Sequence, residues 1–366
     1  MKKGLTFQAI TLAFFTLIFS TNSSAQEAIF AQYYNAPMQL NPALTGVFSG
    51  QWRANVNYRQ QWNNSFNNAP ITSFQAGYDY RIKTVDADYF NVGFSAIDDQ
   101  TGNDNHIKST RGNFSFSYMK QLGGSRYRHN TQYLVAGGQV GVGQNSLTTD
   151  NLWFDRQYDS IANRPNSSLN SGELVPQSNM YLDYNVGLLF YSTWAENRSL
   201  YIGASLHHLS QPNVSFFGDR TETLRRRFTL HGGGEIPINK ELSVMPSAMI
   251  TLQGPSMTSL FGANVRYSNH DWNEVAVRMG ASFRIANRYL YNINSDGTQV
   301  QTGVGILNDA LTVTGILELN RWLIGASYDI HTSSITLPTN GRGAWELSLI
   351  YTGAEKRRVR TDCPRF

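Results

Sequence analysis

The sequence is poor in cysteine, in charge and in long apolar runs, and each shortage excludes a class of protein. Its one cysteine, Cys363, cannot form an internal disulfide, which excludes a disulfide scaffold and a cysteine-based zinc site. Charged residues make up 15% of the chain, against about 25% in average soluble proteins. No stretch approaches the roughly 18 consecutive apolar residues of a membrane-spanning helix. The net charge of +4 gives no sign of a nucleic-acid surface, so we expect no nucleic-acid partner.

The amino terminus has the pattern of an export signal. Lys2 and Lys3 precede an apolar run over residues 12–19, and small residues follow at 23–25. We therefore predict a cleavable signal peptide over residues 1–25, with Gln26 as the first mature residue. No cysteine lies at the cleavage point, so a lipoprotein anchor is not expected.

Residues 51–62 largely alternate between apolar and polar side chains. Because successive side chains of a strand point to opposite faces, this segment has one apolar face with aromatic ends and one polar face. Such a wall between lipid and water is typical of a transmembrane β-barrel, as are the 13% aromatic content and the 31 glycines. Lipid contact is predicted for Trp52, Val56 and Tyr58, and lumen contact for Arg53, Asn55 and Arg59.

The same period of two recurs along the chain and predicts an all-β fold, a single antiparallel barrel of the outer membrane with about fourteen strands, over residues 51–352. The predicted strands are 51–62, 71–82, 89–98, 112–121, 132–144, 181–192, 198–206, 226–235, 241–253, 258–267, 275–285, 310–319, 322–329 and 345–351.

The lengths of the connections support an even strand number. In bacterial outer-membrane barrels the periplasmic turns are short and the outward loops are long. The longest connections, 99–111, 145–180, 207–225 and 286–309, all follow odd-numbered predicted strands. Both termini are therefore expected on the periplasmic side.

Motifs for catalysis or metal binding are scarce. His231–Gly234 matches an oxyanion-hole loop of esterases, but the chain lacks the Gly-x-Ser-x-Gly elbow and the match lies within an alternating strand. The seven histidines show no zinc-binding spacing. We expect no enzymatic activity, cofactor or metal, although Asp98, Asp99, Asn103 and Asp104 leave open a calcium ion in an outward loop.

Two basic clusters are candidates for contacts outside the barrel. Arg225, Arg226 and Arg227 lie where the long connection 207–225 meets the eighth predicted strand, and either lipopolysaccharide phosphates or an acidic partner segment would meet them there. Residues 353–366 form a basic tail with Lys356, Arg357, Arg358, Arg360 and Arg365. This tail is expected in the periplasm, against a partner or against lipid head groups.

The two ends of the chain carry specific motifs that resemble one known family. They are Gln32-Tyr33-Tyr34-Asn35-Ala36-Pro37, Leu40-Asn41-Pro42-Ala43, Tyr58-Arg59-Gln60-Gln61-Trp62, Gly325-Ala326-Ser327-Tyr328-Asp329, Glu346-Leu347-Ser348-Leu349 and Cys363-Pro364-Arg365-Phe366. Together they resemble the PorP/SprF family of type IX secretion system membrane proteins of Bacteroidetes. The insertion 286–309 departs from the family pattern.

The resemblance implies a non-enzymatic barrel that works with the secretion and gliding machinery. Members similar to SprF are paired with giant surface adhesins, whose carboxy-terminal signal they help to export and retain. Members similar to PorP serve secretion more generally. We expect the SprF-like role, with the carboxy-terminal region of an adhesin, other type IX components, outer-membrane lipid and lipopolysaccharide as partners. A passive diffusion porin is the remaining alternative.

Residues 26–50 precede the first strand and are expected to be a periplasmic segment or a plug. The two prolines Pro37 and Pro42 restrict the backbone before them. Burial at the periplasmic mouth of the barrel is expected for the apolar groups here. The partner or plug candidates are Tyr33, Tyr34, Asn35, Pro37, Asn41 and Pro42, and the family-motif residues of the barrel are Tyr58, Arg59, Trp62, Tyr328, Asp329 and Glu346.

Overall fold

The structure is a computed structural model that describes most of the chain. The described residues are 27, 29–62, 70–84, 87–102, 107–125, 130–148, 155–159, 163–166, 168, 180–195, 197–216, 222–269, 275–293, 299–333, 341–354 and 363–365. The predicted signal peptide, Asn103, Asp104 and the basic residues 356–360 lie outside them. None of the helices in the described part is long and apolar enough to cross a membrane.

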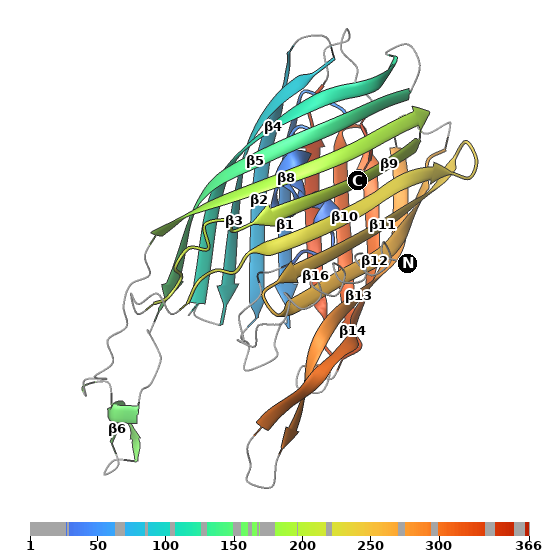
Figure 1. Cartoon of the computed structure of the whole chain (residues 1–366). Coiled ribbons are helices and arrows are strands. Elements are labelled where there is room, and N and C mark those ends of the chain that lie inside the picture. Colours follow the sequence, from blue (N-terminus) through green and yellow to red (C-terminus); the bar gives the residue numbers. More distant parts are fainter. Residues whose placement is uncertain are drawn as a thin grey trace, which may run out of the picture.

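Fourteen antiparallel strands close into a single barrel, as the alternation predicted. Each strand pairs with its neighbour along the chain, and β1 pairs with β16 to close the ring (Figure 1). The strands are β1 (Trp52–Gln61), β2 (Ile71–Lys83), β3 (Tyr89–Thr101), β4 (Ile107–Ser125), β5 (Asn130–Leu147), β8 (Met180–Ala195), β9 (Arg198–His207), β10 (Arg227–Pro237), β11 (Leu242–Gln253), β12 (Ser256–Tyr267), β13 (Val275–Ile293), β14 (Gln299–Leu319), β15 (Trp322–His331) and β16 (Ala344–Thr352).

The two faces of the wall follow the predicted parity. In β1, Val56 is 38% exposed on the outer face, whereas Arg53, Asn55 and Arg59 are buried on the inner face. Large apolar side chains are exposed around the outside, including Phe94 and Phe114. A polar inside and an apolar outside are the reverse of a soluble protein, and they fit a barrel whose outer face meets lipid.

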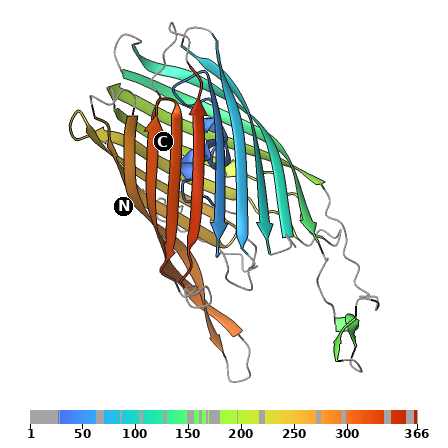
Figure 2. The same ribbon diagram turned by 180° about the vertical axis from the view of Figure 1, so that it is seen from behind.

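The connections differ strongly between the two ends of the barrel. At one end, the turn end, they are short, as at 196–197 and 320–321. The other end, the loop end, carries the connections after β5 and β9, which span 148–179 and 208–226. The first of these holds η3 (Asp155–Gln157) and the small hairpin of β6 (Tyr158–Asp159) and β7 (Arg164–Pro165), which projects from the barrel in Figures 1 and 2.

The predicted loop 286–309 is wrong in large part, because β13 and β14 continue through most of it as a projecting hairpin (Figure 2). Register shifts between Arg284 and Ile285 and between Leu290 and Tyr291 accompany the extension. Beyond the lipid layer the outer face of a strand need not be apolar. The alternation that reveals a strand in the sequence therefore ends before the strand does.

Candidate functional site

Residues 29–50, which we call the plug, lie inside the barrel. The plug contains η1 (Tyr33–Asn35), α2 (Pro37–Leu40) and η2 (Pro42–Leu44), seen as the blue coils within the ring of strands in Figure 1. A proline at the start of α2 and η2 presets the backbone, and the Asn41 side chain caps η2 by accepting from Ala43 N at 2.9 Å. Short helices thus let the plug turn repeatedly within the lumen.

The plug enters near the loop end and leaves at the turn end. Glu27 lies beside Gln253 at the loop end of β11, and Gln51 lies beside Gly353 at the turn end of β16. The sequence predicted burial at the periplasmic mouth alone. The structure instead places the plug along the lumen, because inward polar side chains of many strands bind its backbone.

Plug carbonyl groups accept hydrogen bonds from strands around the wall. Asn35 O accepts from Asn55 Nδ2 at 3.2 Å and from Asn57 Nδ2 at 3.0 Å. Further donors come from the other strands: Gln139 Nε2 to Met38 O, Ser205 Oγ to Leu40 O, Ser117 Oγ to Thr45 O, and the Arg81 guanidinium to Gly46 O. Buried backbone groups that are satisfied in this way hold a segment in one position.

Asn41 and its neighbour Pro42 lie close to the backbone of the wall. Asn41 Nδ2 donates to Leu188 O at 3.0 Å and lies 3.0 Å from His231 Nε2. A Cβ at Gly187 would overlap the Asn41 side chain, so only glycine permits this approach. His231, part of the sequence that resembles an esterase loop, therefore contacts the plug.

A buried ionic network joins the plug to three family-motif residues. Arg59 pairs with Asp329 at 2.6 Å and with Glu346 at 3.2 Å. Glu346 also accepts from Ala31 N at 2.7 Å and from Gln32 N at 2.9 Å. Because both carboxylates are buried with several donors, this network fixes the start of the plug to β1, β15 and β16.

A second ionic cluster lies at the loop end around Glu27, which the sequence reasoning did not single out. Glu27 pairs with Arg111, with Arg227 at 2.5 Å and with His208 at 3.0 Å. Burial lowers the pKa of His208 to about 4, and its hydrogen bond to Asp183 opposes that shift. At neutral pH the positive charge that faces Glu27 therefore comes from the two arginines.

The basic run 225–227 is divided by the wall. Arg227 is buried in the lumen and donates to Gln39 O at 3.1 Å, whereas Arg226 is exposed and Arg225 half-buried. Alternation along β10 explains the division, since Arg227 shares its parity with the inward residues Thr229 and His231. Only Arg225 and Arg226 remain candidates for contacts outside the lumen.

The other predicted site residues fall on three surfaces. Tyr33 and Tyr34 are buried in the plug, where burial raises the pKa of Tyr34 to about 12 although Arg278 opposes the shift. Tyr58 packs on Trp345 with ring centroids 5.1 Å apart, and Tyr328 is 47% exposed on the outer face. Trp62 lies at the loop end, 6.1 Å from the His331 ring.

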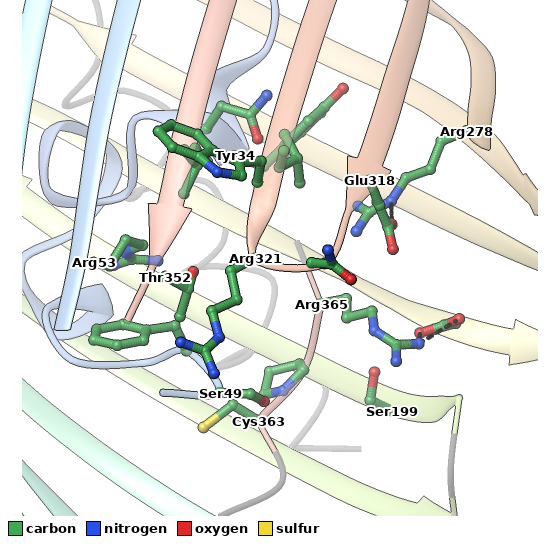
Figure 3. A pocket seen from close by; sticks show the side chains of 18 of the residues that line it. Tyr34, Ser49, Arg53, Ser199, Arg278, Glu318, Arg321, Thr352, Cys363 and Arg365 are labelled. Carbon is green, nitrogen blue, oxygen red and sulfur yellow. Dashed lines mark hydrogen bonds and ion pairs between the residues drawn. The ribbon is translucent and has the colours of Figure 1, made fainter. Parts of the chain in front are cut away.

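The turn end holds the described part of the carboxy-terminal tail. Cys363 is buried and accepts from Arg81 at 3.0 Å, and Arg365 pairs with Glu235 at 3.2 Å. Between this tail, the plug and the wall lies a cavity of about 390 Å³ (Figure 3). Arg53, Arg278 and Glu318 are among its lining residues.

The described residues contain no group of three or more His, Cys, Asp or Glu that would hold a metal ion. Asp98 and Asp99, the described part of the calcium alternative, accept instead from neighbouring side chains such as Gln100 and Arg111. The inward side chains of the wall hydrogen-bond to the plug within the lumen. Such an arrangement can hold the plug in place and leaves a polar opening at each end of the barrel for binding.

A comparison of the sequence with known protein families found a match over most of the chain. The sequence profile described as "Type IX secretion system membrane protein PorP/SprF" matches residues 22–351. A search of curated proteins found no match.

Solved barrels are similar over most of the chain at low identity. Omp33 of Acinetobacter baumannii is 8% identical with a TM-score of 0.37, covering 84% of this chain and 99% of its own. A mutant of the TodX monoaromatic hydrocarbon channel is 11% identical with a TM-score of 0.44, covering 86% and 93%. The translocator domain of autotransporter NalP from Neisseria meningitidis is 11% identical with a TM-score of 0.32, covering 87% and 96%.

The profile spans nearly all of the barrel, and the family motifs from Gln32 to Leu349 lie within the matched residues. The chain belongs to the PorP/SprF family of type IX secretion system membrane proteins.

Proposed function

We propose that this barrel binds the carboxy-terminal region of a large secreted surface adhesin and supports its export and retention at the outer membrane. The observation that carries the proposal is the fastened plug. A lumen crossed by a segment that many strands bind is unsuited to free diffusion, so the barrel acts through binding at its mouths. No enzymatic step is part of this function.

In the proposed orientation the loop end faces outward and the turn end faces the periplasm. Long connections on one side and short turns on the other support it. Arg225 and Arg226 then stand near the outer leaflet, where guanidinium groups suit lipopolysaccharide phosphates or an acidic segment of the partner.

The projecting β13–β14 hairpin supports a binding role for the loop end. β12 pairs with β13 only as far as Ala286, and β15 pairs with β14 only from Ala310 onward. Among the described strands, the outer edges of the hairpin beyond those residues therefore have no neighbouring strand. Such edges offer backbone N–H and C=O groups to an extended partner segment.

Deletion of the gene tests the proposal. Surface display of one adhesin, and the gliding or attachment that it drives, should be lost while other type IX cargo is still secreted. Affinity purification of the tagged barrel should recover the carboxy-terminal fragment of that adhesin. A variant in which residues 287–307 are replaced by a tight turn should assemble but fail to recover the fragment.

Two other outcomes would replace the proposal. Loss of all type IX secretion on deletion would support the general PorP-like role. Unchanged secretion of every cargo, together with free ion conductance of the purified barrel in a planar bilayer, would support the passive porin.

A further inference from the structure

The cavity at the turn end has the features of a ligand site. Its volume of about 390 Å³ lies within the range of roughly 300 to 1,000 Å³ that small-molecule sites occupy. The plug contributes Tyr34 and Phe48, and the tail contributes Arg365. Three separate parts of the chain thus meet around one space (Figure 3).

Positive charge is in excess around this space. Five arginines line the cavity, Arg53, Arg198, Arg278, Arg321 and Arg365, together with the two carboxylates Glu235 and Glu318. Behind the lining, Asp79 pairs with Arg53 at 2.7 Å, and Arg266 pairs with Glu318 at 3.0 Å. The negative charge of Asp79 and the positive charge of Arg266 cancel, so the lining keeps its excess of positive charge. An anionic group in the cavity would relieve the excess.

A buried hydroxyl points to the same ligand. Ser199 is 7% exposed, and its Oγ has no hydrogen-bond partner among the residues that the structure describes. It lines the cavity near Arg365 (Figure 3). A buried polar atom that lacks a partner is costly, and a hydrogen-bonding ligand would satisfy it.

We propose that this cavity binds a short acidic peptide segment of a partner at the turn end, with carboxylates held by Arg321, Arg365 and the Ser199 hydroxyl. Planar guanidinium groups match carboxylates in bidentate geometry. Several carboxylates along one segment can contact more of the five lining arginines at once than a single phosphate can. The rings of Phe48 and Trp322 offer apolar contacts to neighbouring side chains.

This site lies at the opposite mouth from the proposed adhesin surface and does not depend on it. Fluorescence anisotropy of labelled tetraglutamate with the full-length barrel in detergent, at low salt, tests it. The wild-type protein should bind tetraglutamate at least about tenfold more tightly than tetraglutamine. Excess inorganic phosphate should compete only weakly.

The variants Arg321→Gln and Ser199→Ala should each weaken tetraglutamate binding, by about tenfold and about threefold. Lys240→Gln is the control, because Lys240 is an exposed cation in the turn between β10 and β11 that does not line the cavity, so this variant should leave binding unchanged. Heat-modifiable migration on a gel verifies that each variant is folded. Equal binding of both peptides, equal affinity in all variants, or displacement by phosphate at peptide concentrations would overturn the proposal.

Discussion

The two halves of the lumen are both lined by arginine and carboxylate side chains, but the plug leaves more free space in one half than in the other. Toward the loop end, Arg59 lies between Asp329 and Glu346, and the plug backbone completes the network. Toward the turn end, arginines border a cavity of about 390 Å³. Both halves contact the plug, but only the half toward the turn end leaves a space that a ligand can enter. Four substitutions would break or sharpen this contrast.

The largest effect is expected at Arg59, in the filled half. Arg59→Met leaves two buried carboxylates without a shared cation, and loss of one partner from a buried pair costs about 3 to 5 kcal/mol. Denaturant unfolding of the refolded barrel in lipid vesicles measures this loss. Arg226→Met is the matched control and should change stability by less than about 0.5 kcal/mol. Similar losses in both variants would mean that the network does not stabilise the barrel.

The outer face gives the next largest effect. Val56→Arg places a charge against lipid, which costs about 2 to 4 kcal/mol near the bilayer midplane, so assembly should fall. Asn55→Arg keeps the lipid face intact but displaces a donor to Asn35 O, so the barrel should assemble with a loosened plug. Heat-modifiable migration on a gel measures assembly of the barrel, and single-channel conductance measures whether the plug still blocks the lumen. Equal assembly of both variants would place the register wrong by one residue.

A smaller effect is expected where the plug meets the wall. Gly187→Val would force Asn41 away and should cost about 1 to 3 kcal/mol through overpacking, with an increase in conductance. Gly315→Val is its control, because a Cβ at Gly315 meets nothing within 4 Å. An unchanged conductance in Gly187→Val would show that the plug does not depend on this approach.

The smallest effect belongs to the open half. Arg365 pairs with Glu235, but its side chain is 39% exposed, so Arg365→Gln should cost less than about 1 kcal/mol. The same unfolding measurement applies. A loss as large as that of Arg59→Met would mean that the tail stabilises the barrel as strongly as the plug does, and would end the contrast between the two halves.

The sequence was sufficient for the wall because alternation is a local property. The inward parity of Arg53, Asn55 and Arg59 followed from the period of two alone. Arg227 carried the same signal, since its parity within the eighth strand already placed it in the lumen. The adjacent Arg225 and Arg226 led us to treat all three arginines as one cluster outside the barrel.

The site was harder to predict because its contacts join residues that are far apart in the chain. Glu27 lies 200 residues from Arg227, and nothing in its local sequence marks it. The path of the plug depends on which carbonyl meets which inward side chain. Such pairings exist only once the ring is closed, so the sequence suggested a plug without its course.

The position of the Arg59 network has a consequence for the order of folding. Arg59 is on β1 and Glu346 on β16, 287 residues apart, and these two strands complete the ring. Contacts between such distant residues form slowly, because a long loop must close first. The plug backbone binds the same Glu346. Final closure of the barrel and capture of the plug are therefore one event, and a chain that closed without its plug would bury a carboxylate with two donors missing.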